Sequence, residues 1–107
     1  MNVTPREVEA VLQSFGDVDL AFVTGVPHPD RGEDVVAAVV VAPGYKVDGA
    51  ELRARVKREL SSYKVPRHIE VFADRQELRW LDSGKLDARC MRSLLADRYK
   101  LSGGGAP

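Results

Sequence analysis

The chain has 107 residues, 44% of them hydrophobic, and this length and composition predict one domain with a single small core. Its 16 basic and 16 acidic residues balance, whereas nucleic-acid-binding proteins usually carry a basic excess, so we expect no nucleic-acid partner. The single cysteine excludes an internal disulfide and a cysteine-based metal cluster. No apolar run approaches about 18 residues and no signal-peptide pattern is present, which favours a cytoplasmic protein without a membrane span.

The chain begins with a predicted helix and a strand. Thr4, Pro5 and Glu7 form a helix-start pattern, in which a capping residue is followed by proline at the first helical position. An apolar stripe of helical spacing follows, and Gly16 is a typical residue to end the helix. Residues 18–26 are rich in β-branched and aromatic side chains, which predicts a strand.

A loop and a buried strand are expected next. Residues 27–32 contain two prolines and a glycine, so we predict a loop in which Gly32 takes a positive φ angle. His28 has no partner at catalytic or metal-ligand spacing, and we expect it on the surface of this loop. The continuous apolar run at 35–42 is typical of a strand buried on both faces.

The middle of the chain predicts a second helix that opens at Asp48 or Gly49. Pro66 prevents its continuation, and a short strand is expected at 68–72. Residues 73–77 are polar and loop-like, and residues 78–81 form a short extended piece.

A third helix is expected from Asp87. Its pattern places Ala88, Met91, Leu94 and Leu95 on the inner face, and we expect Cys90 among them to be a buried or half-buried structural thiol. The order α-β-β-α-β-α predicts a small α+β domain, with three helices packed on a sheet of about three strands. We expect the domain to cover residues 1–100 and a flexible tail to cover 101–107.

Lys85 is the most notable polar residue. It follows the turn formed by Ser83 and Gly84, where the glycine would let the backbone approach a ligand and the lysine would offer a point charge to an anion. It is not a Walker A lysine, because Leu86 stands where that motif requires Ser or Thr. From the residues alone, a solvated surface lysine in a polar turn is the better explanation of the pattern.

A second polar stretch, residues 58–67, combines Tyr63 with several cations. Such a mixture suits a nucleotide, through stacking on the base and pairing with phosphate. From the residues alone, the favoured interpretation is a helix terminus whose cations lie near its last carbonyl groups, with Tyr63 half packed.

Four segments together resemble the C-terminal domain of the adenylate-forming superfamily, which includes acyl-CoA synthetases. They are residues 2–9, 25–33, 60–66 with its Tyr-Lys-Val-Pro ending, and the Ser-Gly-Lys-Leu-Asp segment at 83–87. The resemblance implies a carboxylate–CoA ligase of fatty-acid type that first forms an acyl-adenylate from ATP and then transfers the acyl group to a thiol.

The resemblance also implies where the chemistry lies. ATP and CoA would be substrates shared with a large N-terminal domain, Mg²⁺ would bind on that domain, and this chain alone would be inactive and bind no cofactor. Lys85 would be the catalytic residue of adenylation, on the turn opened by Gly84. The acceptor would be CoA or a carrier protein, and positions that correspond to CoA contacts are Arg31, Gly32, Tyr63, Arg67 and Lys57.

One departure from the family pattern lies just before the lysine. The family usually has Pro and Thr there, whereas this chain has Arg79, Trp80 and Leu81, and we expect Trp80 to be exposed in the absence of a partner domain. Two alternatives to the ligase interpretation remain open. The departure is a hint of a non-enzymatic interaction module derived from such a domain, and a chance match of the motifs would make the chain an unrelated α+β domain.

Overall fold

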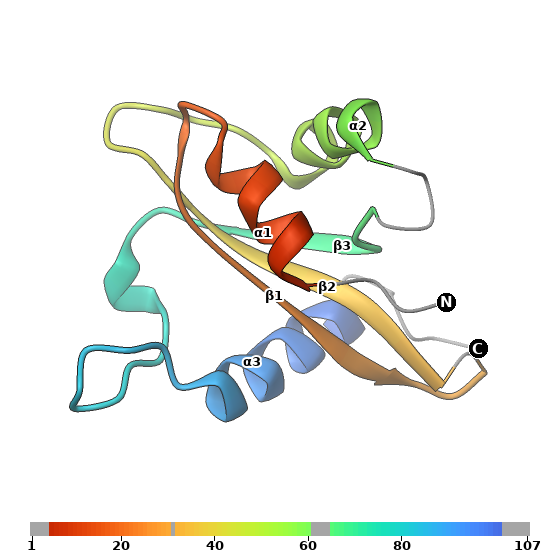
Figure 1. The fold of residues 1–107 in the computed structure, drawn as a ribbon. Helices are drawn as coiled ribbons and strands as arrows, with labels where there is room; N and C mark the ends of the chain where they lie inside the picture. The colour runs from red at the N-terminus through yellow and green to blue at the C-terminus, as the bar shows by residue number, and fades with distance from the viewer. Residues whose placement is uncertain (1–4, 31, 61–64, 102–107) are drawn as a thin grey trace.

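The computed structural model describes residues 5–30, 32–60 and 65–101 (Figure 1). Their order is α-β-β-α-β-α with a 3₁₀ helix before the last helix, which confirms the predicted fold class. The elements are α1 (Pro5–Gln13), β1 (Val18–His28), β2 (Gly32–Val41), α2 (Gly49–Glu59), β3 (His68–Phe72), the 3₁₀ helix η2 (Arg75–Glu77) and α3 (Ala88–Leu101). Apart from Leu101, the predicted tail lies outside the described residues.

The three strands form one mixed sheet in the order β1-β2-β3. β1 and β2 are an antiparallel pair, whereas β2 and β3 are parallel, and β3 begins at His68 opposite Val36, four residues after the start of β2. The connection between the parallel strands contains α2, because parallel neighbours cannot be joined by a tight turn. Since β2 pairs with both β1 and β3, it is the central strand.

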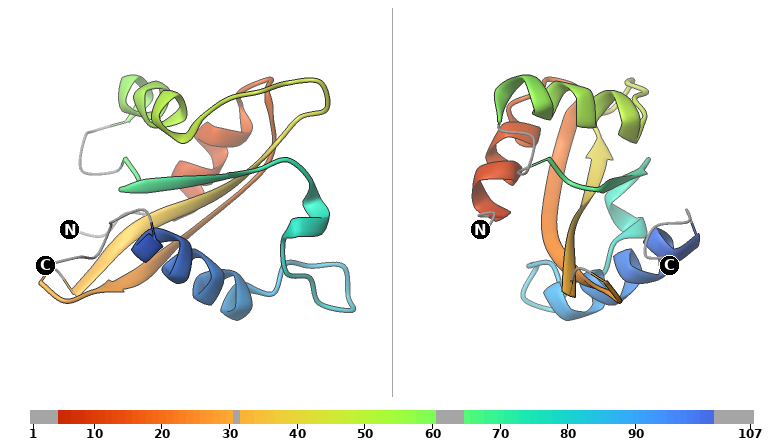
Figure 2. Two further views of the ribbon diagram at one scale, coloured as in Figure 1. Left: turned by 180° about the vertical axis from the view of Figure 1, so that it is seen from behind. Right: turned by 90° about the vertical axis from the view of Figure 1, so that its right-hand side faces the viewer.

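Helices cover both faces of the sheet, as Figure 2 shows. α1 and α2 pack on one face, where Ala37 and Val39 of β2 point, and α3 packs on the other, which receives Val36, Ala38 and Val40. All five of these side chains are buried. This confirms the prediction that the continuous apolar run forms a strand buried on both faces. Side chains alternate in direction along a strand, so a strand covered on both faces is apolar throughout.

The hairpin between β1 and β2 is longer than expected. The strands pair as far as Pro27 opposite Glu33 and His28 opposite Gly32, so the predicted loop at 27–32 is largely strand. Pro27 is tolerated because β1 is an edge strand, where a missing amide hydrogen need not leave a gap in the ladder. Gly32 has a φ of 78°, which confirms the expected positive φ angle.

The outer edge of β1 is partly covered by α1. The carboxylate of Glu9 accepts a hydrogen bond from the Val23 amide at 2.8 Å, and the side-chain oxygen of Gln13 accepts one from the Ala21 amide at 3.1 Å. Edge strands with unpaired backbone groups promote aggregation, so these side chains protect the fold as well as fixing the helix.

The helix ends agree only in part with the sequence. Asp48 caps α2 by accepting a hydrogen bond from the Glu51 amide at 2.7 Å, as predicted. α1 ends at Gln13, before Gly16, and the Phe15 amide then bonds the Leu12 carbonyl at 3.2 Å, three residues back instead of four, so the last turn tightens before the glycine. The predicted cap Thr4 lies outside the described residues. No helix in the described ranges has both the length and the apolar character needed to cross a membrane.

Candidate functional site

Lys85 lies on a small hairpin between η2 and α3. Trp80 and Leu86 pair across it as an antiparallel bridge, and the Leu81 amide donates to the Lys85 carbonyl at 2.7 Å. Gly84 closes the turn with a φ of 89°, a value that L-residues with a side chain rarely adopt. The sequence thus places a glycine where this turn needs one.

The Lys85 side chain is exposed. No carboxylate in the described part of the chain forms an ion pair with its ammonium group. Its positive charge is therefore available to an anion supplied from outside the domain. An internal ion pair would have argued against a role in binding or catalysis.

Asp87 fixes the exit of the hairpin to α3. Its amide donates to the Arg79 carbonyl at 2.9 Å, and its carboxylate accepts from the Cys90 amide at 3.1 Å, which caps the helix. This hydrogen bond from the Cys90 backbone lowers the pKa of Asp87, so the cap is ionised near neutral pH. The charged cap also suits the positive end of the helix dipole.

Cys90 and Ala88 do not point inward as the sequence predicted. Both are exposed, because the buried stripe of α3 runs through Met91, Leu95 and Tyr99 at intervals of four residues and includes neither of them. A hydrogen bond with the Asp87 carboxylate raises the pKa of the Cys90 thiol. The cysteine therefore remains a thiol near neutral pH and is a poor nucleophile.

The residues predicted to contact CoA lie away from Lys85. Gly32 begins β2, and Arg67 directly precedes β3, where its amide donates to the Val35 carbonyl at 2.8 Å. Lys57 lies in the last turn of α2, which leads towards the same end of the sheet. Arg31 and Tyr63 lie outside the described residues.

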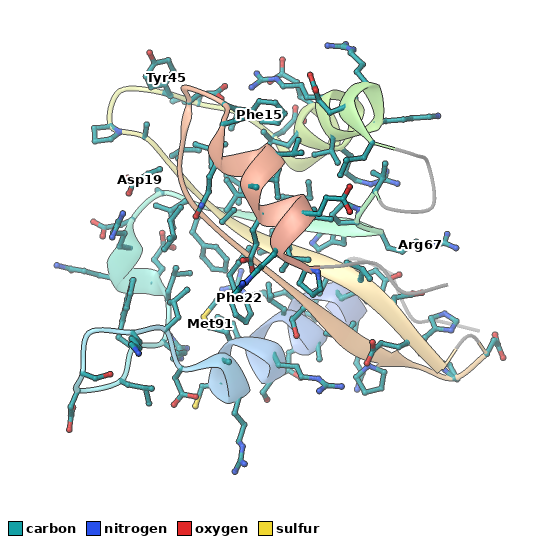
Figure 3. All side chains as sticks on the ribbon, viewed as in Figure 1. Phe15, Asp19, Phe22, Tyr45, Arg67 and Met91 are labelled. Atoms are coloured by element: carbon teal, nitrogen blue, oxygen red, sulfur yellow. The ribbon has the colours of Figure 1, made fainter. Side chains whose placement is uncertain are left out.

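The domain thus has two candidate regions at opposite ends. Gly32 and Arg67 lie where the parallel strands begin, whereas the Lys85 hairpin follows the point where β3 ends. Figures 1 and 2 show both ends from two sides, and Figure 3 shows the Arg67 side chain extending away from the sheet. The structure does not bring Lys85 together with the other predicted site residues.

A shallow hollow of about 240 Å³ lies beside α2. Lys57 and Arg53 line it together with Ala50, Ala54 and Val65. Arg53 is tied down by a 2.8 Å hydrogen bond from its Nε to the Pro66 carbonyl, whereas Lys57 is exposed. Two cations beside an open hollow can bind a phosphate group. The side chains of Arg53 and Lys57 are both exposed, so their positive charges are accessible to such a group.

His28 is buried, and this corrects its predicted surface position. Its Nε2 lies 3.9 Å from the carboxylate of buried Asp34, which also accepts a 2.7 Å hydrogen bond from the Tyr99 hydroxyl. Its Nδ1 accepts from the Asp30 amide at 3.1 Å. The sequence pattern missed this cluster because β1 extends further than expected, which carries His28 into the sheet and beside Asp34.

No group of three or more His, Cys, Asp or Glu residues is placed to hold a metal ion in the ranges that the structure describes. Trp80 and Leu81 beside Lys85 are 38% and 47% exposed, as predicted for Trp80. Large apolar side chains at the surface often mark an interaction site. The hairpin therefore combines a free cation with apolar contact area.

Comparisons with known proteins point to one family. The family model for AMP-binding enzyme C-terminal domains matches residues 7–85. A feruloyl-CoA synthase from Amycolatopsis sp is 44% identical over 85 residues, which cover 79% of this chain and 17% of that protein. A Mycobacterium tuberculosis (strain ATCC 25618 / H37Rv) ligase, named as acting on medium/long-chain fatty acids and 3-oxocholest-4-en-26-oate, is 44% identical over 87 residues, covering 81% and 15%.

Solved structures agree with this assignment. An amide bond synthetase from Marinactinospora thermotolerans is 43% identical with a TM-score of 0.77, and the match covers 87% of this chain and 18% of that one. Apo MatB from Rhodopseudomonas palustris is 31% identical with a TM-score of 0.81, covering 92% and 19%. The chain thus spans less than a fifth of the relatives it matches, and it belongs to the family of AMP-binding enzyme C-terminal domains found in acyl-CoA and other adenylate-forming ligases.

Proposed function

We propose that this chain supplies the adenylation lysine, Lys85, to the large domain of an ATP-dependent carboxylate–CoA ligase. The observation that carries the proposal is the state of Lys85: an exposed ammonium group, unpaired in the described residues, on a turn fixed at its base. The Ser-Gly-Lys segment that resembles the family motif lies on this turn.

The proposed role is electrostatic. When a carboxylate attacks the α-phosphate of ATP, negative charge develops on the phosphoryl oxygens and pyrophosphate leaves. A cation placed beside these oxygens stabilises the transition state more than the ground state. The large domain would provide the ATP site, the acid pocket and Mg²⁺, because a domain of 107 residues is too small to hold all of these sites.

CoA is the proposed acceptor for the second step. Both curated relatives described above are named as CoA ligases or synthases. Lys57 and Arg67 would contribute positive charge for the phosphates of CoA, and Gly32 would allow its backbone to approach the ligand. The resemblance adds Arg31 and Tyr63 to this proposed surface.

The test is a hybrid enzyme in which this chain replaces the C-terminal domain of the Amycolatopsis feruloyl-CoA synthase. With ferulate and ATP, adenylation is measured by pyrophosphate exchange. We expect Lys85→Ala to slow adenylation by roughly 10²–10³-fold, the usual loss for one transition-state donor. Lys100→Ala, which removes an exposed lysine at the end of α3, should leave the rate unchanged.

Pyrophosphate exchange that survives Lys85→Ala at full rate would remove Lys85 from the mechanism. The isolated chain should show no adenylation. A non-enzymatic role is the second candidate, and the exposed Trp80 and Leu81 beside Lys85 favour it as a docking surface. Unchanged turnover in Lys85→Ala, combined with a stable complex between the chain and the large domain, would support that candidate instead.

A further inference from the structure

The hairpin that carries Lys85 has two stems, and only one of them leads directly into a helix. The exit stem continues into α3 through the Asp87 cap. The entry stem follows η2 and contains Trp80, whose main chain pairs with Leu86. A lysine on such a hairpin can hold one position only if the entry stem is fixed as well.

Trp80 fixes the entry stem through its side chain. Its indole Nε1 donates a 2.8 Å hydrogen bond to the carbonyl of Arg75 in η2, although 38% of the residue is exposed. Indole has only this one polar hydrogen, and no other natural side chain of similar shape can place a donor there. The bond ties the hairpin to η2 at a point outside its own main-chain ladder.

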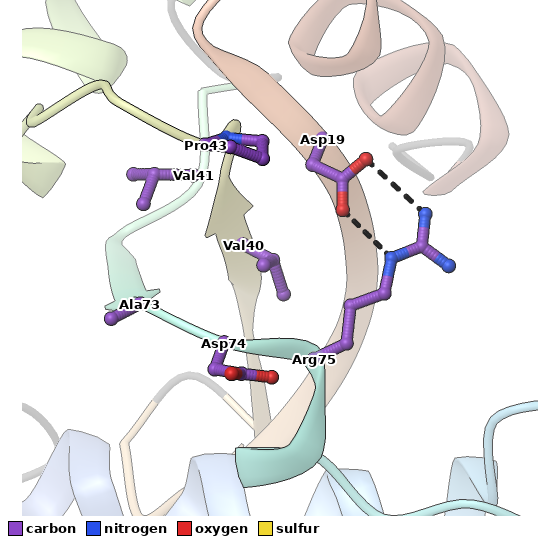
Figure 4. Close-up of a pocket in the computed structure, with 7 residues that line it drawn as sticks. All are labelled: Asp19, Val40, Val41, Pro43, Ala73, Asp74 and Arg75. Atoms are coloured by element: carbon purple, nitrogen blue, oxygen red, sulfur yellow. Dashed lines mark hydrogen bonds and ion pairs between the residues drawn. The ribbon is translucent and has the colours of Figure 1, made fainter.

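Arg75 is itself held in place. Its guanidinium bonds Asp19 of β1 at 2.7 and 3.3 Å, as Figure 4 shows. η2 is closed by a capping box in which Asp74 accepts from the Gln76 amide at 2.8 Å and Glu77 accepts from the Asp74 amide at 3.0 Å. The carbonyl that receives the indole hydrogen is thus part of a short, internally bonded element attached to the sheet.

We infer that Trp80 is a positioning residue for Lys85. A continuous path runs from β1 through the Arg75 side chain and carbonyl to the Trp80 indole, and from Trp80 across the hairpin to Leu86, the neighbour of Lys85. The path sets the direction of the Lys85 turn relative to the sheet. This explains what Trp80 does at a position where the family usually has other residues. The catalytic consequence rests on the proposed function, whereas the anchoring itself does not.

Trp80→Phe is the informative variant, because it keeps an aromatic ring and removes only the indole donor. In the isolated chain, hydrogen exchange is followed by NMR at the Leu81 and Gly84 amides, which form the two hydrogen bonds of the turn. We expect both amides to exchange about fivefold faster, the factor for loss of one hydrogen bond of ~1 kcal/mol. Ser14→Ala is the matched control, since it removes another exposed side-chain bond to a carbonyl, that of Val11 at 2.6 Å, and should not affect these amides.

The hybrid enzyme gives the catalytic test. Trp80→Phe should lower kcat for adenylation roughly fivefold, as ~1 kcal/mol of lost transition-state stabilisation implies. KM for ATP should not change, and neither should thioester formation from preformed feruloyl-adenylate. A loss shared equally by both half-reactions would indicate general destabilisation and overturn the positioning role.

The Trp80 anchor and the adenylation role of Lys85 can be refuted independently of each other. Unchanged exchange at Leu81 and Gly84 in Trp80→Phe would refute the anchor, whatever the hybrid enzyme does. Full adenylation by Lys85→Ala would refute the proposed function, and the exchange rates would still decide whether Trp80 anchors the turn.

Discussion

Among single residues, Asp17 and Arg55 show how a side chain fastens two elements. Arg55 of α2 bonds Asp17, just before β1, at 2.8 Å, and its guanidinium lies 5.4 Å from the centre of the Phe15 ring. The hydrogen bond from Arg55 lowers the pKa of Asp17 below its usual value of 3.8. The pair thus fixes the connection between α1 and β1 onto α2.

This pair predicts a pH-dependent stability. A carboxyl group with a lowered folded-state pKa stabilises the fold above its unfolded pKa, and that contribution is lost as the pH falls through the folded value. Asp17→Asn should therefore cost about 0.5 kcal/mol near neutral pH, as expected for a partly exposed ion pair. The difference from the natural chain should shrink as the pH falls below 3.8.

Urea unfolding at several pH values measures this difference. Asp97→Asn, on the exposed side of α3 and with no ion pair in the described residues, is the control and should show no such trend. A cost of Asp17→Asn that stays constant down to the lowest pH would show that the charge of Asp17 is not what stabilises the connection.

At the level of elements, the packing of α2 against β3 depends on Gly49. A Cβ atom on this first helical residue would clash with the carbonyl oxygen of Ile69, which is backbone and cannot move aside. Gly49→Ala should therefore destabilise the domain by about 2 kcal/mol, a typical cost of overpacking. Gly16→Ala is the matched control, because no atom lies within 4 Å of the added methyl group.

Chemical denaturation of both variants distinguishes the steric effect from the general effect of replacing glycine. Gly16→Ala should be neutral or slightly stabilising, since alanine reduces the freedom of the unfolded chain. Equal stability of the two variants would mean that α2 can shift away from β3 at no cost.

The elements also show which features a sequence reveals. The apolar run of β2 and the Asp48 cap of α2 depend on neighbours in the chain, and both were predictable. The burial of His28 depends on Asp34 in the paired strand and on Tyr99, which is 65 residues from Asp34. Such long-range contacts leave no local pattern.

The same limit applies to the candidate site. The Ser-Gly-Lys segment predicted an exposed lysine on a glycine turn, and the structure has one. A buried or half-buried Cys90 was expected from its apolar neighbours, but the buried stripe of α3 follows Met91, Leu95 and Tyr99 and leaves Cys90 exposed. The Trp80 anchor was not predictable, because the group that accepts its hydrogen bond is a main-chain carbonyl.

For the whole molecule, the main feature is the separation of the two candidate regions. Because β2 and β3 are parallel, both strands start at the same end of the sheet, where Gly32 and Arg67 lie. The chain leaves β3 at the opposite end of the sheet and continues to the Lys85 hairpin. Under the proposed function the two ends serve different steps, so the domain would present each end to the large domain in turn. The topology therefore suits the proposed function, in which Lys85 serves adenylation and the opposite end of the domain meets CoA.

This arrangement predicts that the two half-reactions can be separated by mutation. In the hybrid enzyme, the double variant Lys57→Ala/Arg67→Ala should raise KM for CoA roughly fivefold, as expected for ~1 kcal/mol of lost phosphate attraction. Adenylation, measured by pyrophosphate exchange, should stay unchanged, since neither residue is near Lys85 in the fold. Steady-state thioester formation at varied CoA concentration measures the change in KM, and higher ionic strength should reduce the difference between variant and parent.

The double variant Arg6→Ala/Lys100→Ala is the control, because it removes the same charge from other exposed positions and should change neither step. If the Lys57→Ala/Arg67→Ala variant slows adenylation as much as thioester formation, the two ends of the domain do not act in separate steps. Lys57 and Arg67 would then have no specific role in CoA binding.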